Sequence, residues 1–453
     1  MKTNKVGTSS CSSICDKDLT GPSENESGSA DGSNINHNGM SVWKTVLFVA
    51  GENAGCALLA LPYAINESGW LGIFLIVMCA IDSAISGALI GKCWLILEER
   101  WPEFRGHCRY PYPAIGKMAF GNWMRIIVSV CMQITLIGSS VVVLLICAQL
   151  ISTILETYVE LSFGIWIIII GAAIYPFMLL GTPTEFWPAA AAALGTTSIA
   201  VILLLIDMSI EMSALPELPE VSTPTISTIS LAFGTILFAY GGTAAFPTFQ
   251  NDMKDKSKFS IAVCIGFLIL LLIYIPIASM GYLTYGAFIK NNVILSVSGG
   301  WKRNVALILM SGHLFFAFLL VIIAPIHEIE SFLNVPRGFS WKRVVTRFSV
   351  LVAVVFLGET LPHFGKILDL IGGSTIALLS YILPPVFYLK LCYSRKAEWP
   401  ERSVSKLELI YYSKIIIMGI IGGISCTIWA LRGILAPDAL TLPCYIDYNC
   451  RNE

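Results

Sequence analysis

The stretch AGENAGCALLALPYAINESGW, from Ala50 to Trp70, is the most informative part of this chain. It lies in an apolar run of membrane-spanning length, but glycines and the carboxylate of Glu52 interrupt that run. Lipid cannot hydrogen-bond a broken backbone, so a break at this depth must line a cavity or bind something. The stretch therefore predicts a membrane transporter.

The composition predicts an all-α polytopic membrane protein. Of 453 residues, 55% are hydrophobic and 13% are charged, and the mean hydropathy is +0.73, which is too apolar for one soluble core. The net charge of −1 offers no basic surface for nucleic acid, and most of the thirteen cysteines lie in apolar runs as small hydrophobes. The patterns CxxC, HExxH, GxSxG and the P-loop are absent, which argues against an enzyme; no metal or cofactor is expected.

Residues 1–40 predict a disordered tail. They contain eight Ser, five Gly and five Asn, and they hold too little apolar surface to offset the entropy of ordering. No apolar segment suited to a cleavable signal peptide precedes Val42, so we expect the first membrane helix to direct insertion.

A transmembrane domain is expected over residues 41–434. It contains eleven apolar runs of roughly twenty residues, each long enough to cross a hydrocarbon core of about 30 Å. In order, the expected transmembrane helices are 43–64, 70–96, 124–151, 165–181, 187–207, 228–250, 259–282, 305–329, 344–361, 367–391 and 409–434. Gly87, in the second run, is expected to serve helix packing alone and to tolerate alanine.

The basic residues predict the orientation of these helices. With the amino-terminal tail on the cytosolic side, 23 of the 29 Lys and Arg residues fall in the tail or in and around the cytosolic loops, including the adjoining helix ends, and six fall on the other side. Since basic residues are retained on the cytosolic side, this split favours a cytosolic amino terminus. Residues 435–453 then form an external or lumenal tail.

A second interrupted run, FGTILFAYGGTAAFPTFQ at 233–250, carries the pair Gly241 and Gly242 at its middle. It lies five helices after the first. Residues 43–207 and 228–391 thus form two five-helix segments of nearly equal length and opposite topology, the pattern of an inverted repeat whose broken helices meet at the midplane. Helix 409–434 is an addition. The alternative is that these glycines only allow close helix packing.

The two breaks offer complementary chemistry. A half-helix beginning near Cys56 exposes N–H groups suited to a carboxylate, and one ending at Phe238 to Tyr240 exposes carbonyls suited to an ammonium group or cation. An amino acid zwitterion fits both, although an organic acid or an ion fits the same geometry. The candidate substrate-binding residues are Gly51, Asn53, Ala54, Gly55, Cys56, Phe238, Ala239, Tyr240, Gly241, Gly242 and Thr243.

At these residues the chain closely resembles the amino acid/auxin permease family, within the amino acid, polyamine and organocation transporter superfamily. The family pattern of the first helix is matched by Gly55, Leu59, Leu61, Pro62, Tyr63, Ala64, Gly69 and Trp70. The pattern of the sixth helix is matched by Phe238, Tyr240, Gly241, Gly242, Pro247, Gln250, Asn251 and Met253. The resemblance implies an eleven-helix, LeuT-like fold with two five-helix inverted repeats, and secondary active transport of amino acids.

The chain departs from the family pattern at the site itself. The family's Asn-Ala pair falls on Gly51 and Glu52, its second glycine falls on Ala57, and the His after its Gly-Gly pair is Thr243. These departures leave the substrate open. Sodium-coupled relatives complete an ion site with hydroxyls on helix 8, where this chain has Ser311 and then His313, so a proton is favoured over sodium as the coupling ion.

Glu52 is the outstanding ionisable residue of the membrane segments. A carboxylate at midmembrane costs about 2.5 to 3.5 kcal/mol on insertion scales, so its first interpretation is a proton or ion site. The alternative is a structural hydrogen-bond donor. His313 and Ser311 are the other coupling candidates, whereas Asp82 and Asp369 are expected to tie helices together.

The sequence thus predicts a proton-coupled amino acid transporter in a vesicular, lysosomal or plasma membrane, with the lipid bilayer and a small-molecule substrate as its partners. A carrier of another small zwitterion, amine or organic acid is the alternative within the same fold. An amino acid sensor that binds without transport is the alternative in another class. The choice between symport and antiport, the amino acid and the oligomeric state stay undetermined.

Overall fold

The computed structural model describes residues 39–106, 108, 110–179, 187–217, 219–336, 340–397 and 399–436, with the backbone alone for 187–189. Nearly all of the expected amino-terminal tail and of the expected external tail lies outside these residues. Within the described ranges the regular structure is helical, and the one β-type contact is an isolated bridge between Met40 and Met253.

Seven helical segments of the described chain are long and apolar enough to cross a membrane. They are α3 (Leu71–Arg100), α5 (Asn122–Leu155), α7 (Trp187–Ala214), α10 (Phe259–Tyr285), α11 (Trp301–Phe332), the continuous series α13 (Phe364–Ile371), η7 (Gly372–Ile382) and α14 (Leu383–Tyr393), and α15 (Lys406–Ile434). The shorter helices include α1 (Val42–Asn53), α2 (Leu61–Ser68), α4 (Pro111–Phe120), α6 (Phe163–Leu179), α8 (Ile226–Ala239), α9 (Phe246–Asn251) and α12 (Trp341–Thr360).

Each of the eleven expected segments coincides with one of these helices or with a consecutive series of them. Two features were not expected. The loop after α3 contains α4, which starts at Pro111 and stops at Gly121, whose φ of +94° suits glycine. The series over 364–393 contains the π-helix η7, a form that is rare and often found at functional sites.

Both predicted interruptions occur, and they have the same construction. α1 gives way to a four-residue 3₁₀ turn, η1 (Cys56–Leu59), before α2 begins. α8 gives way to the four-residue turn η3 (Gly241–Ala244) before α9 begins. In both cases a proline within the first two helical positions, Pro62 or Pro247, restarts the short second helix, where its missing N–H costs nothing.

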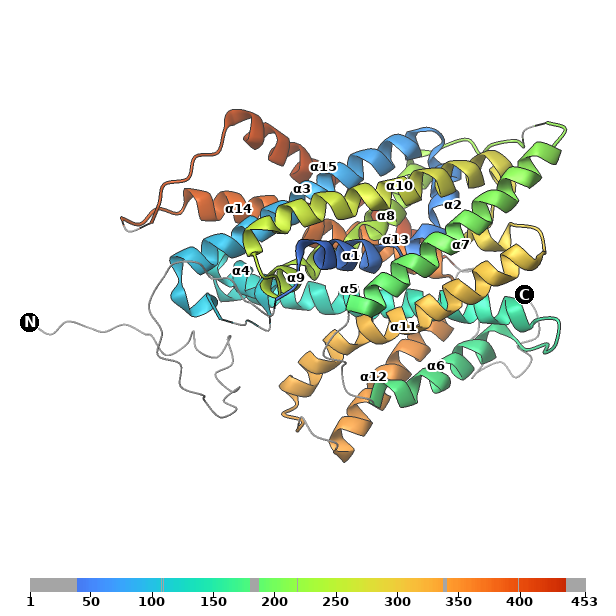
Figure 1. The fold of residues 1–453 in the computed structure, drawn as a ribbon, viewed down its shortest axis with the longest axis horizontal. Coiled ribbons are helices and arrows are strands. Elements are labelled where there is room, and N and C mark those ends of the chain that lie inside the picture. The colour runs from blue at the N-terminus through green and yellow to red at the C-terminus, as the bar shows by residue number, and fades with distance from the viewer. Residues whose placement is uncertain are drawn as a thin grey trace, which may run out of the picture.

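The helices run roughly along the long axis of the molecule, so the structure has two ends (Figure 1). We call the end where α1 begins and α9 lies the tail end. The opposite end, where α2 lies, is the far end. Between them α1 packs against α10 and α7, and α2 packs against α8, which places the two breaks in the interior.

The two aspartates expected to tie helices together do so. The buried carboxylate of Asp82 in α3 accepts hydrogen bonds from Lys414 Nζ at 2.6 Å and from the Tyr411 hydroxyl at 2.6 Å, both in α15. Asp369 in α13 accepts a bond of 2.5 Å from the Thr235 hydroxyl in α8. A buried carboxylate is tolerated when it is paired in this way.

Candidate functional site

The first break is formed by a backbone that folds back on the end of α1. The Gly55 N–H donates to the Asn53 carbonyl oxygen at 2.8 Å, which turns the chain out of the helix. Cys56 and Ala57 open the turn η1, so their N–H groups have no acceptor within that turn. These N–H groups form the positive end of the second half-helix, as the sequence predicts.

Asn53 joins the first break to the second. Its side-chain Oδ1 accepts a hydrogen bond of 3.0 Å from the Gly242 N–H, and its Nδ2 donates to the Val49 carbonyl oxygen at 2.8 Å. A Cβ atom at Gly242 would lie 2.7 Å from Asn53 Nδ2, closer than such atoms can approach. The two breaks are therefore in direct contact, and glycine is required at position 242.

Tyr274 in α10 bridges the ends of both broken helices. Its buried hydroxyl lies 2.6 Å from the Asn53 carbonyl oxygen and 3.1 Å from the Ala239 carbonyl oxygen. One hydroxyl proton serves both acceptors. Tyr274 could not be predicted from the sequence, because its only signal is a single hydroxyl in a long apolar run. The Ala239 carbonyl was expected to be open, and it is instead an acceptor for this hydroxyl.

His313 in α11 lies against the first break and joins three helices. Its Nδ1 is 3.1 Å from the Ala193 carbonyl oxygen and 3.2 Å from Thr197 Oγ1, both in α7, and Thr197 Oγ1 donates to the Ala54 carbonyl oxygen at 3.1 Å. Because a carbonyl only accepts, Nδ1 carries the proton, and the neutral ring keeps a lone pair on Nε2. A Cβ atom at Gly55 would lie 3.6 Å from that Nε2.

Ser311, the hydroxyl expected beside His313 as an ion ligand, bonds within its own helix. Its Oγ donates to the Leu307 carbonyl oxygen at 2.7 Å, and the residue is buried. Among the residues that the structure describes, no group of three His, Cys, Asp or Glu side chains is placed to hold a metal ion.

The predicted substrate-binding residues divide by accessibility. Glu52 is exposed, and Gly55, Phe238, Gly241 and Gly242 are partly exposed. The buried members are Gly51, Asn53, Ala54, Cys56, Ala239, Tyr240 and Thr243. The accessible surface at the breaks is therefore one carboxylate, one aromatic ring and three glycines.

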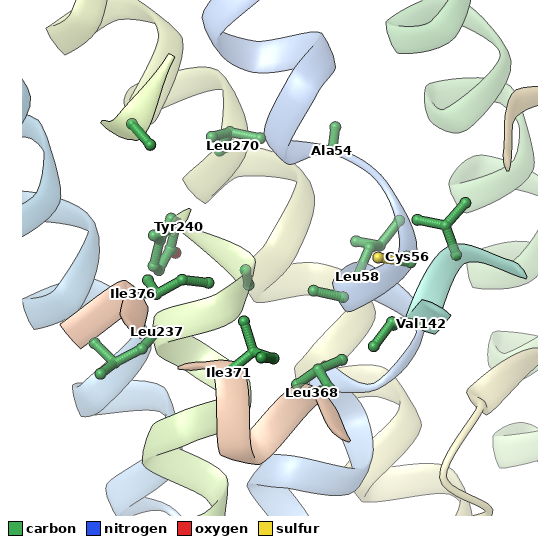
Figure 2. Packing of buried hydrophobic residues seen from close by; sticks show 14 of the residues in the cluster. Ala54, Cys56, Leu58, Val142, Leu237, Tyr240, Leu270, Leu368, Ile371 and Ile376 are labelled. Carbon is green, nitrogen blue, oxygen red and sulfur yellow. The ribbon is translucent and has the colours of Figure 1, made fainter. Parts of the chain in front are cut away.

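Apolar side chains pack tightly around this surface. Figure 2 shows Cys56 and Leu58 at the first break, with Val142 of α5 beside them, and Leu237 and Tyr240 near Ile376 of η7 at the second. The Tyr240 ring lies 5.4 Å from the ring of Tyr274, so the Tyr240 side chain packs against α10. A Cβ atom at Gly241 would lie 2.7 Å from Ile376, so the π-helix closely abuts the second break.

Glu52 lies on a face of α1 that is turned inward. One turn earlier Phe48 lies on the same face, and its ring is 5.3 Å from that of Phe249 in α9. Trp43, on the opposite face, is 67% exposed. Within the described ranges, the Glu52 carboxylate makes no hydrogen bond or ion pair.

The sequence matches the model of the family described as "Transmembrane amino acid transporter protein" over residues 38–429. Its relatives include the Arabidopsis thaliana amino acid transporters AVT1J and AVT1I, 25% and 24% identical over 77% and 87% of this chain and 82% and 95% of theirs. AVT1B of the same plant is 24% identical over 78% of this chain, and the chain spans 65% of its length.

Solved transporter structures share the fold. A single-site mutant of the Eremococcus coleocola manganese transporter superposes with a TM-score of 0.52 at 14% identity over 87% of both chains. The inward-facing conformation of Mhp1 gives 0.50 at 12% identity over 90% of this chain and 93% of that one. The named relatives and the manganese neighbour are transporters and not enzymes, as the sequence predicts.

Proposed function

Because this chain belongs to the transmembrane amino acid transporter family, we propose that it is a secondary active transporter that moves an amino acid across a membrane by alternating access. We place eleven crossings in the membrane, with 43–207 and 228–391 as inverted repeats. The observation that carries the proposal is the direct contact of the two breaks, made by the Asn53 side chain on Gly242 and by the Tyr274 hydroxyl on both helix ends. Interrupted helices meet in this way where a transporter binds its substrate.

The substrate lies, in this proposal, on the accessible surface between Gly55 and Gly242. Its carboxylate is bound by the N–H groups of Cys56 and Ala57, at the positive end of the half-helix that follows the first break. Its ammonium group lies toward the negative end of α8, next to Phe238. Of the three accessible glycines, Gly55 has the most room beside it for a substrate, because the nearest atom to a Cβ there is His313 Nε2 at 3.6 Å.

The coupling ion is a proton that His313 binds at Nε2. Protonation of this buried ring adds a charge at the point where α1, α7 and α11 are joined through Thr197 and Ala193, so it changes how firmly α1 is held. Sodium is disfavoured because the Ser311 hydroxyl bonds within its own helix.

The burial of α5 supports access from the tail end. In the half of α5 toward the far end, the eight consecutive residues from Val141 to Ala148 are all buried, which requires packing on every side of the helix. In the half toward the tail end, only a stripe of residues that includes Val128 and Thr135 is buried. At the far end Asn292, after α10, donates to Gln149 of α5 at 3.1 Å and ties α5 to the loop that follows α10. We assign this conformation to the inward-facing state. In this proposal the amino-terminal tail lies in the cytosol, and the protein resides in a vesicular, lysosomal or plasma membrane.

Reconstitution of the full chain in proteoliposomes tests the proposal. We expect at least one amino acid of a panel of the standard amino acids to accumulate above its external concentration when a pH gradient is imposed, and a protonophore that dissipates the gradient to abolish that accumulation. Binding without accumulation would instead identify a sensor. Accumulation driven by a sodium gradient at constant pH would overturn the assignment of the proton.

A further inference from the structure

Two of the three charged side chains of the broken helices are acidic. Beyond Lys44 in the first turn of α1, the charged residues of α1 and α2 are Glu52 and Glu67, and α8 and α9 carry none. A zwitterion bound at the breaks has no net charge, and its two groups match the opposite helix ends. The carboxyl group of Glu52 is then left without a partner on the zwitterion.

Other interior carboxylates of the described chain have partners. Asp82 is paired with Lys414, Asp369 accepts from Thr235, and Glu328 accepts from Ser129 and Gln133. Glu52 differs from them, because within the described ranges it has neither an ion pair nor a hydrogen bond, and it is exposed. Its carboxylate is therefore available to a ligand.

The position of Glu52 relative to the breaks fits one kind of ligand. Glu52 is the penultimate residue of α1, so it lies less than one helical turn, about 5 Å, from the end of the helix after which Gly55 turns the chain. This matches the reach of an aliphatic stem of three or four methylenes that starts from an amino acid bound at Gly55. The partly exposed rings of Phe48 and Phe249 lie one turn beyond Glu52, where they offer a ring face to a cation held at Glu52.

We propose that Glu52 binds the positively charged side chain of the substrate, so that this site selects cationic amino acids of the lysine, ornithine and arginine type. The inference rests on the proposed function, because it assumes that an amino acid occupies the breaks. It gives Glu52 a role separate from that of His313: the carboxylate recognises the substrate, and the imidazole carries the coupling proton. In the sequence analysis Glu52 was itself a coupling candidate, and the experiment separates the two roles.

The experiment compares lysine with norleucine, which has the same carbon chain but no side-chain ammonium group. Uptake of both is measured in proteoliposomes that hold the wild-type chain, Glu52→Gln or Glu67→Gln. We expect the wild type to prefer lysine by at least tenfold in kcat/KM, and Glu52→Gln to reverse or abolish that preference while norleucine still accumulates with the pH gradient. Glu67→Gln, which makes the same charge change in α2, should keep the wild-type preference.

Three results would overturn the inference. The wild type would prefer norleucine, or Glu52→Gln would keep the lysine preference, or Glu52→Gln would lose uphill accumulation of both substrates and so assign the proton to Glu52. Lysine-induced thermal stabilisation of the detergent-solubilised variants covers the case of poor insertion, because Glu52→Gln must lose it and Glu67→Gln must retain it. Failure of the wild type to take up any amino acid would overturn the proposed function together with the inference.

Discussion

The two helix breaks have the same backbone construction but different surroundings. At the first break the neighbours are polar or ionisable: Glu52 and Asn53 on the helix itself, and His313 with Thr197 across from it. At the second break the glycines are closely packed against their neighbours. Gly241 abuts Ile376. Gly242 likewise abuts Asn53. The first break therefore supplies chemical groups, and the second supplies close contact, so that substitutions at the two should have different consequences.

The largest effect is expected at the second break. Alanine at Gly242 would place its Cβ atom 2.7 Å from Nδ2 and 3.0 Å from Oδ1 of Asn53, whose amide is fixed by two hydrogen bonds. We expect Gly242→Ala, and more so Gly242→Leu, to reduce uptake to below a tenth of wild type at equal membrane expression. Gly312→Ala is the control, since no atom lies within 4 Å of its Cβ position. Wild-type uptake by Gly242→Leu would show that the second break is not part of the site.

The next effect concerns the proton at the first break. His313→Asn keeps an N–H donor near the position of Nδ1, for the Ala193 carbonyl, and removes the basic Nε2. We therefore expect substrate exchange within about threefold of wild type, loss of uphill accumulation and a flat dependence of uptake on pH. Ser311→Ala, on the same helix, should leave all three unchanged. A wild-type pH profile in His313→Asn would assign the proton to another group.

Much of this comparison could be predicted from the sequence, because run length and interrupting glycines act locally. The breaks, the eleven helical segments and the helix-tying roles of Asp82 and Asp369 follow from such signals. Contacts between distant segments gave no such signal. Tyr274 and the π-helix that contains Ile376 were missed for this reason, and burial of Tyr240 and Thr243 depends on which side of the break faces the interior.

Gly87 is another residue whose contacts with distant segments could not be predicted from the sequence. It was expected to serve helix packing alone and to tolerate alanine. In the structure its Cβ position lies 2.8 Å from the ring of Phe246, at the start of α9, and 3.0 Å from Val263. The packing role is confirmed, but the expectation of tolerance is wrong because the neighbours are too close. Gly312, whose Cβ position has no such neighbour, is the suitable control for the substitutions at Gly242.

A smaller effect is expected where the two breaks share one group. Tyr274→Phe removes the hydroxyl proton that the Asn53 and Ala239 carbonyls share, and a buried carbonyl left without a donor costs about 1–3 kcal/mol. We expect a lower melting temperature and a several-fold slower uptake, with the substrate preference unchanged. Tyr282→Phe, in the same helix, is the matched control. A change of preference in Tyr274→Phe would show that the hydroxyl contacts the substrate.

The smallest effect is expected at the glycine of the first break. The nearest atom to a Cβ at Gly55 is Nε2 of His313 at 3.6 Å, an ordinary van der Waals distance, so alanine fits without displacement. Gly55→Ala should insert normally and retain at least half of wild-type transport, with any loss appearing in KM because a methyl group enters the accessible surface. Kinetics of Gly55→Ala and Gly242→Ala measured side by side decide the comparison. If both variants fail equally, the first break depends on close contact as the second does, and the division between chemical groups at one break and close contact at the other is wrong.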